Sequence, residues 1–373
     1  MNTTSTDTII FSPGRINLIG EHIDYNGGYV LPAAIDLKIK FRFRKKQGYI
    51  CVVTSESKGS LKFDINKKLI TTEGHWGNYV LGVISGILKL RPGKLEGFEC
   101  TFKSELPIGS GISSSAALEC GIAKGLNELF NLGLSDYEII EIAKIAEHKF
   151  VGTKCGVMDQ FAVVMGIKRK LILLNCETLE YDFIDADFSP YKICLLNTNI
   201  SHNLSTSAYN KRREECELSL KTISKDYPEF KNLANIPLSI IEKYKNKLTP
   251  DIYKRAIYVS MENTRTKKAA EMIQNGQLKH FGELMYQSHE GLSNKYEVSC
   301  DELDFLVDFT KDLDHVIGSR MMGGGFGGCT INIIHKHSVK NFIDSISKDY
   351  EKIFKIKLTS IIVSTSDGVS IES

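Results

Sequence analysis

The sequence predicts an α+β fold in two domains, and the order of its strand and helix patterns is the reason. The first third holds runs rich in β-branched and aromatic residues, which are typical of strands: YVLPAAI, KIKFRFR, YICVVTS and GFECTFKSEL. Two more strands, LILLN and KICLLNT, precede a mainly helical stretch at residues 251–312, and the tail alternates strand, helix and strand. A chain of 373 residues suits two domains or one large one, and we expect a boundary near residues 195–205.

Helical patterns lie between and after these strands. One helix begins at or inside the serines at 113–115, because apolar residues recur at helical spacing directly after them. The segment SDYEIIEIAKIAEHKF opens with a capping box, in which Ser135 and Glu138 bond each other's backbone N–H groups. Further helical segments are expected at residues 76–90, at residues 209–224 and, as a short excursion, within residues 225–250.

The composition argues against several classes of function. The formal net charge is +2 and no long block of lysine or arginine occurs, so we expect no nucleic-acid partner. The longest apolar-leaning stretch, residues 79–88, is far too short to span a membrane. The start MNTTSTDTII lacks the pattern of a secretory signal, and the nine cysteines form no CxxC pair. We therefore expect a cytoplasmic protein with reduced thiols and no membrane partner, and we favour a monomer.

The most informative segment is PIGSGISSSAA at residues 107–117. Gly109 and Gly111 let the backbone approach a ligand, and the helix that follows directs free N–H groups and its positive dipole end at one place. Such a loop binds anions, and the adjacent hydroxyls suit a phosphate with its metal. The pattern GxxxxGK[ST] is absent, so the segment is either another class of nucleotide loop or a capped turn.

A second polar cluster lies in GRINLIGEHIDYNGG, residues 14–28. Two carboxylates, a histidine and a guanidinium stand among apolar residues, an arrangement suited to gripping a polyhydroxylated molecule. The alternative is a strand end followed by a solvated turn. The residues concerned are Arg15, Asn17, Glu21, His22, Asp24 and Tyr25.

Two other segments have competing interpretations. GGGFGG at residues 323–328 contains GxGxxG, but the β-type run CTINII follows it where a dinucleotide site requires a helix. We therefore predict a tight backbone crossing there. Asp159 in CGVMDQF lies among apolar residues, where it is either functional or part of a structural salt bridge or helix cap.

Taken together, three motifs resemble those of the GHMP small-molecule kinases in order and spacing: GRINLIGEHIDYNGG, LPIGSGISSSAALE and GSRMMGGGFGGCTI. The first resembles the signature of the galactokinase family, as do AEHKFVGTKCGVMDQF, STSAYNKRREEC and SHEGLSNKYEVSCDELD. The resemblance runs from Phe11 to Ile334. It implies an N-terminal lobe similar to the second domain of ribosomal protein S5 and a ferredoxin-like C-terminal lobe, which we assign to residues 1–198 and 199–373.

The resemblance also implies an activity: ATP-dependent phosphorylation of the anomeric hydroxyl of α-D-galactose, with ATP as co-substrate and Mg²⁺ as cofactor. Two alternatives stay open at this point. One is a related sugar kinase such as an N-acetylgalactosamine kinase, and the other is a non-catalytic galactose sensor on the same fold.

Residue roles are carried over from the family position by position. Asp159 matches the general base and Arg15 the cation beside it. The sugar-contacting positions are Glu21, His22, Ile23, Asp24, Gly156, Asp159 and Tyr209. The loop around the ATP phosphates comprises Gly109, Ser110, Gly111, Ile112, Ser113, Ser114 and Ser115, and Gly323 to Gly328 match the loop that supports it. The adenosine pocket includes Ser55 and Trp76, and the Mg²⁺ ligands are Ser115, with Ser114 as the alternative, and Glu147.

Three of these positions depart from the family pattern. Ser110 and Ile112 replace the usual alanine and leucine of the phosphate loop, and Ile23 stands where threonine is usual. None of the departures removes a catalytic group.

Overall fold

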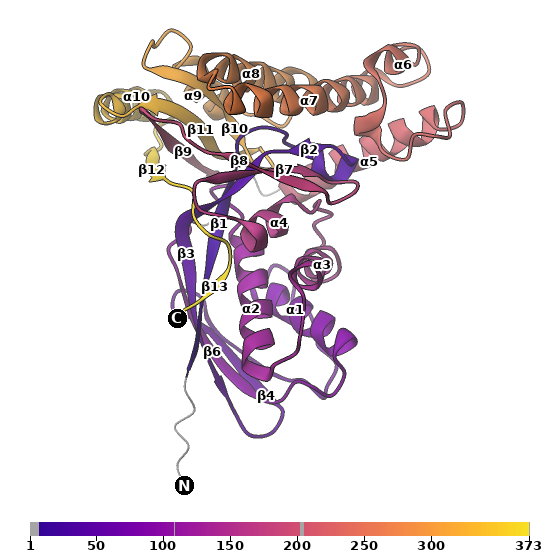
Figure 1. Ribbon diagram of the computed structural model, residues 1–373, viewed down its shortest axis with the longest axis vertical. Coiled ribbons are helices and arrows are strands. Elements are labelled where there is room, and N and C mark those ends of the chain that lie inside the picture. The colour runs from indigo at the N-terminus through magenta and orange to yellow at the C-terminus, as the bar shows by residue number, and fades with distance from the viewer. Residues whose placement is uncertain (1–6, 108, 202–204, 373) are drawn as a thin grey trace.

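Figure 1 presents a computed structural model of the chain, which describes residues 7–107, 109–201 and 205–372. The described residues form three sheets, of which a six-stranded and a four-stranded sheet dominate the two halves of the molecule. Figure 1 shows the N-terminal half below, with its helices on one face of the large sheet, and the C-terminal helices stacked above. The predicted α+β class is confirmed. Among the described residues, none of the helices has the length and apolar character needed to cross a membrane.

The six-stranded sheet has the order β13-β1-β3-β6-β4-β5. Its strands are β1 (Thr8–Asn17), β3 (Pro32–Lys45), β4 (Ile50–Ser55), β5 (Gly59–Asp64), β6 (Phe98–Ser104) and β13 (Ser370–Ile371). The predicted runs YVLPAAI and KIKFRFR join in the single long strand β3, which pairs antiparallel with β1 along most of its length. The C-terminal strand β13 returns to pair with β1.

Four helices lie on one face of this sheet: α1 (Gly77–Leu90), α2 (Ser114–Phe130), α3 (Asp136–Ala146) and α4 (Met158–Met165). Helices α2 and α4 pack against β1 and β3, and α1 and α3 pack on α2. Helix α2 packs closely on β3 because Gly121 and Gly125 have no side chain at the contact. A Cβ at these positions would lie 2.3 Å from the ring of Phe41 and 2.0 Å from the ring of Phe43, respectively. The helix predicted to begin in the serines is confirmed as α2. The capping box that opens α3 is confirmed as well.

The four-stranded sheet has the order β10-β11-β9-β12. Its strands are β9 (Tyr191–Ser201), β10 (Val316–Met322), β11 (Gly327–His335) and β12 (Thr359–Val363). Helices connect β9 to β10, and α10 (Val339–Phe354) connects β11 to β12. This succession with the first and third strands central is the ferredoxin-like arrangement, as the family resemblance implies.

The remaining α-helices lie between β9 and β10. They are α5 (Ser205–Ile223), α6 (Leu238–Glu242), α7 (Pro250–Gln274), α8 (Leu278–Gly291) and α9 (Asp301–Asp308), with the short turns η3 (Leu233–Asn235) and η4 (Leu292–Tyr296). Both the helical stretch at 251–312 and the excursion within 225–250 are thus confirmed. Helix α8 approaches β10 so closely that a Cβ at Gly282 would lie 1.6 Å from the carbonyl oxygen of Ile317.

The third sheet joins β2 (Tyr29–Val30), β7 (Lys170–Asn175) and β8 (Tyr181–Asp185) in the order β2-β7-β8. The proposed division between residues 198 and 199 would cut through β9, which belongs to the C-terminal sheet from Tyr191 onward. Division by sheet membership therefore favours a boundary before Tyr191. The return of β13 to the first sheet means that the tail contributes to both halves.

Candidate active site

Two adjoining cavities lie around the N-terminus of α2. The first, of about 250 Å³, is lined by charged and aromatic side chains that include Arg15, Asp24, Glu147, Asp159 and Tyr209. The second, of about 360 Å³, is more apolar and is lined by side chains that include Ser55 and Trp76. Tyr79 and Ser115 line both cavities, so the start of α2 forms their common wall.

Asp159 lies in the first turn of α4 and lines the first cavity, with 27% of its side chain exposed. The Arg15 Nε donates to Asp159 Oδ1 at 2.8 Å, and the Arg15 side chain is 4% exposed. Arg15 also donates from Nη1 to the carbonyl of Gly111, while its backbone N–H donates to the carbonyl of Ile112 at 3.0 Å. The pair is therefore joined to the glycine–serine loop.

The glycine–serine loop has the backbone that its residues predict. Gly109 and Gly111 have φ of 74° and 71°, which glycine adopts without steric cost. A Cβ at Gly111 would lie 3.0 Å from the carbonyl oxygen of Met322, at the start of the GGGFGG segment. The predicted tight crossing of the two glycine segments is confirmed. The Ser110 hydroxyl bonds the carbonyl of Pro107, and the Ile112 side chain belongs to the hydrophobic core.

Glu147 and Ser115 come from different elements and line the same cavity. Helix α3 ends at Ala146, and the π-helical turn η2 (Glu147–Val151) follows directly and leads the chain to Gly152. Burial and the nearby Asp159 together raise the pKa of Glu147 to about 7, although a hydrogen bond from the Ser115 hydroxyl lowers it. The pair thus supplies a carboxylate and a hydroxyl beside the glycine–serine loop.

Glu21 is held by a residue that the sequence interpretation missed. Its Oε1 accepts from Arg320 Nη2 at 2.9 Å and from the backbone N–H of Gly323 at 2.8 Å. Burial opposes the charged form, but Arg320 and then Arg15 outweigh it and lower the pKa of Glu21. Arg320 also donates to the carbonyls of Leu18 at 2.7 Å and Asn17 at 2.6 Å, and is fully buried. Arg320 therefore connects the segment GSRMMGGGFGGCTI to the N-terminal segment GRINLIGEHIDYNGG.

His22 lines the cavity but uses both ring nitrogens within the protein. Nε2 lies 3.2 Å from the carbonyl oxygen of Gly324, which can only accept, so Nε2 carries the proton and Nδ1 accepts from the Tyr25 hydroxyl at 2.9 Å. Burial lowers the pKa of His22 to about 4, which leaves the ring neutral. The hydrogen-bond chain continues from Tyr25 to the Tyr296 hydroxyl at 2.8 Å and to Cys216 Sγ at 3.1 Å.

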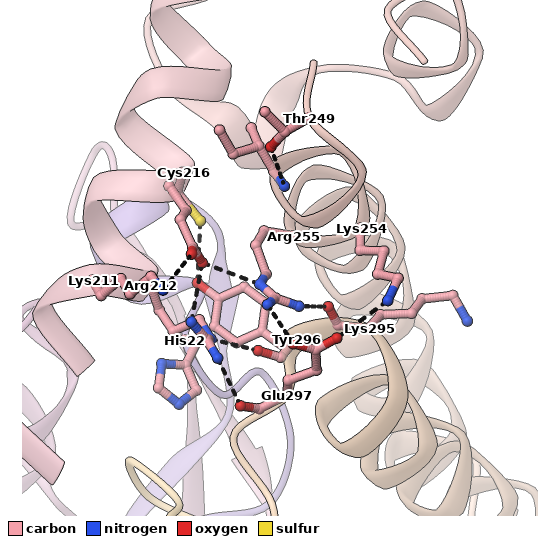
Figure 2. Close-up of polar contacts among 12 residues, drawn as sticks. His22, Lys211, Arg212, Cys216, Thr249, Lys254, Arg255, Lys295, Tyr296 and Glu297 are labelled. Carbon is pink, nitrogen blue, oxygen red and sulfur yellow. Dashed lines mark hydrogen bonds and ion pairs between the residues drawn. The ribbon is translucent and has the colours of Figure 1, made fainter. Parts of the chain in front are cut away.

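Polar contacts hold helix α5 next to Tyr296, as Figure 2 shows. Arg212 donates to the carbonyls of Tyr296 at 2.7 Å and Glu297 at 3.0 Å. Arg255 of α7 pairs with Glu215 at 3.1 Å and with Glu297 at 2.7 Å. These contacts hold the face of α5 that presents Tyr209 to the cavity, where its ring lies 5.2 Å from that of His22.

Asp24 and Gly156 touch across the cavity wall. A Cβ at Gly156 would lie 2.1 Å from Asp24 Oδ2, so only glycine leaves room for this carboxylate. Burial and, to a smaller extent, the neighbouring Asp159 together raise the pKa of Asp24 to about 7. In contrast, Ile23 is fully buried in the core and is absent from the cavity lining, so the structure gives its side chain a packing position rather than a sugar contact.

This fold and site define a GHMP kinase. The model of the GHMP kinases N terminal domain matches residues 78–167, and the model of the GHMP kinases C terminal region matches residues 269–352. The first match contains the glycine–serine loop, Glu147 and Asp159, and the second contains Arg320 and the GGGFGG segment.

The matches extend to a particular family. The galactokinase galactose-binding signature matches residues 2–45. A galactokinase of Thermosipho africanus is 39% identical over 96% of this chain and 98% of its own length, and one of Clostridium tetani is 42% identical over 93% and 89%. The crystal structure of Lactococcus lactis galactokinase complexed with galactose has a TM-score of 0.93 at 34% identity, covering 98% of this chain and 95% of that one. The chain belongs to the galactokinase family.

Proposed function

We propose that this protein transfers the γ-phosphoryl group of ATP to the anomeric hydroxyl of α-D-galactose, giving galactose 1-phosphate. The observation that carries the proposal is the common wall of the two cavities. ATP seated in the cavity of Ser55 and Trp76 would direct its terminal phosphate past Ser115 toward an acceptor beside Asp159. The Lactococcus lactis relative, with galactose bound, supports the choice of sugar.

Asp159 and Arg15 have the geometry for the acceptor side of this reaction. Phosphoryl transfer has a loose transition state, so positioning and neutralisation of charge account for most of the catalysis. Asp159 faces the cavity and would accept the anomeric proton as the sugar oxygen bonds to phosphorus. Arg15, at 2.8 Å from Asp159, would offset the negative charge that develops between the sugar oxygen and the phosphoryl group.

The start of α2 has the geometry for the donor side. The free N–H groups of its first turn and the positive end of its dipole favour phosphate oxygens. The left-handed glycines Gly109 and Gly111 allow the backbone to curve around them. We assign Ser55 and Trp76 to the adenosine and the loop from Gly109 to Ser115 to the phosphates.

Ser115 and Glu147 fit a Mg²⁺ ion that accompanies ATP. Mg²⁺ prefers oxygen ligands and keeps several waters, so one hydroxyl, one carboxylate and phosphate oxygens suffice. The raised pKa of Glu147 indicates a buried carboxylate whose charge its protein neighbours do not offset. When bound, the ion would supply positive charge to the phosphate oxygens.

We assign the reading of the sugar to the far wall of the first cavity. Asp24 offers carboxylate oxygens and Gly156 leaves the space for them, while the ring of Tyr209 closes one side. Because Arg320 binds Glu21 and both nitrogens of His22 are engaged, we assign these two residues chiefly to the shape of the site.

The test is an ADP-release assay on wild-type protein with galactose, glucose, N-acetylgalactosamine and 2-deoxygalactose. A site built to bond a hydroxyl rejects analogues that leave its groups unpaired, by about 10⁴-fold in favourable cases, so galactose should exceed glucose by that order in kcat/KM. Comparable turnover of N-acetylgalactosamine would indicate a related sugar kinase instead. Galactose binding without ADP release would indicate a sensor.

We also propose that the protein acts in the cytoplasm. All nine cysteines are free thiols, which is compatible with a reducing compartment. Fractionation of cells followed by the galactose assay on each fraction would test this location.

A further inference from the structure

Ser113 has a contact that its place in the phosphate loop does not predict. Its hydroxyl donates to Oδ2 of Asp159, while Arg15 donates to Oδ1 of the same carboxylate. Ser113 occupies the N-cap position of α2, yet its side chain makes no capping hydrogen bond. The hydroxyl is therefore directed at the base rather than at the helix end, where an N-cap serine ordinarily bonds.

The backbone of Ser113 supports the same conclusion. Its φ and ψ of 58° and 50° are left-handed, whereas an N-cap residue ordinarily has extended angles. A residue other than glycine is strained in this region, and such strain gathers at functional sites. The left-handed turn brings the hydroxyl of this N-cap residue to a carboxylate on α4.

The two donors together fix the plane of the Asp159 carboxylate. A terminal carboxylate torsion is broad, so a single donor such as Arg15 leaves the group free to turn about its Cβ–Cγ bond. With one donor on each oxygen that rotation is blocked. The carboxylate has about four lone-pair sites, so two stay available for the sugar hydroxyl.

We propose that Ser113 is a positioning residue for Asp159, which makes the phosphate loop part of the apparatus that aligns the base. This inference rests on the proposed function, because alignment matters only if Asp159 accepts the anomeric proton. It also links the two substrates: Gly111, Ile112 and Ser113 of one loop all bond the Arg15–Asp159 pair.

The test uses Ser113→Gly, which removes the hydroxyl and relieves the left-handed strain, so that loss of activity cannot be assigned to misfolding. Because small misplacements of reacting groups cost up to about 100-fold, we expect kcat to fall about 10- to 100-fold. The KM for ATP should change less than about threefold. Ser113→Ala, which keeps the strain, should lose a similar factor in kcat and be less stable than Ser113→Gly.

A double-mutant cycle that combines Ser113→Gly with Asp159→Ala completes the test. The control is Lys355→Gly, which relieves backbone strain at another left-handed residue (φ 59°), far from the cavities. In the Asp159→Ala background, Ser113→Gly should change kcat by less than about twofold, and the Tm changes of the two substitutions should not add. Lys355→Gly should leave kcat unchanged. Unchanged kcat in Ser113→Gly, additive effects on Tm, or a rise confined to the KM for ATP would overturn the proposal.

The Tm cycle needs no turnover. If the wild-type protein fails to phosphorylate galactose, the proposed function fails, whereas additivity in Tm alone refutes the Ser113–Asp159 contact. The two failures are therefore distinguishable.

Discussion

Removing the Asp24 carboxylate should stabilise the protein without substrate, and the gain should depend on pH. The pKa of Asp24 is raised from 3.8 to about 7, first by burial and then by the neighbouring Asp159. Between these two values the folded state holds a proton that the unfolded state releases. The contribution of Asp24 to stability therefore falls as pH rises from about 4 to 7, and it stays low above pH 7.

The size of the effect follows from the same values. A rise to about 7 corresponds to at most about 4 kcal/mol, at about 1.4 kcal/mol for each pH unit. The side chain is partly open to the cavity, and solvent there lessens the penalty. We therefore expect Asp24→Asn to raise the free energy of unfolding by about 1–3 kcal/mol at pH 8, with little gain at pH 4.5.

The assay is urea denaturation without galactose or nucleotide at several pH values between 4.5 and 8. Asp182→Asn, at an exposed position on β8, is the matched control and should differ from wild type by less than about 0.5 kcal/mol throughout. A gain that does not vary with pH, or a loss of stability at pH 8, would show that the buried charge of Asp24 does not destabilise the folded protein. The same substitution should weaken galactose binding by about 1–3 kcal/mol in isothermal titration, because a buried hydrogen bond is lost.

Three further predictions concern the other charged groups of the site. Asp159→Asn should lower kcat by about 10²–10⁴ while galactose still binds in titration calorimetry, and turnover within a few-fold of wild type would make Asp159 structural. Ser115→Ala with Glu147→Gln should shift the Mg²⁺ dependence of the rate to higher concentration with galactose affinity retained, and an unchanged Mg²⁺ titration would contradict their assignment. Arg320→Met should destabilise the fold by about 3–5 kcal/mol, because it strands the buried carboxylate of Glu21. The exposed pair of Arg42 provides the control, since Arg42→Met should cost less than about 1 kcal/mol, and equal losses would refute the role of Arg320.

Much of the site could be predicted from the sequence because its motifs are local. The glycine–serine loop requires Gly109 and Gly111 for its left-handed turns and a helix directly afterwards, and both requirements can be read along the chain. The capping box at Ser135 is equally local. The crossing at GGGFGG was predictable in kind, because a run of glycines before a strand permits close backbone approach.

Other features depend on pairings between distant residues, which periodicity does not encode. Arg320 lies within the strand β10, and its role appears only when β10 meets the carbonyls of Leu18 and Asn17 in the other half of the chain. The pairing of β13 with β1 is equally remote in sequence. The family resemblance placed Ile23 among the sugar-contacting positions, but its apolar side chain is buried in the core.

The structure of the product tests most directly whether the phosphoryl group is transferred to the anomeric hydroxyl of galactose. Wild-type protein is incubated with ATP, Mg²⁺ and galactose, and the phosphorylated sugar is examined by ¹H–³¹P correlation NMR. The arrangement of Asp159 beside the common wall of the two cavities predicts a phosphorus that couples to the anomeric proton of α-galactose 1-phosphate. Asp159→Asn should form this product at least about 100-fold more slowly. A phosphorus coupled to the protons at carbon 6, or no phosphorylated sugar from the wild-type protein, would contradict phosphoryl transfer to the anomeric hydroxyl at this site.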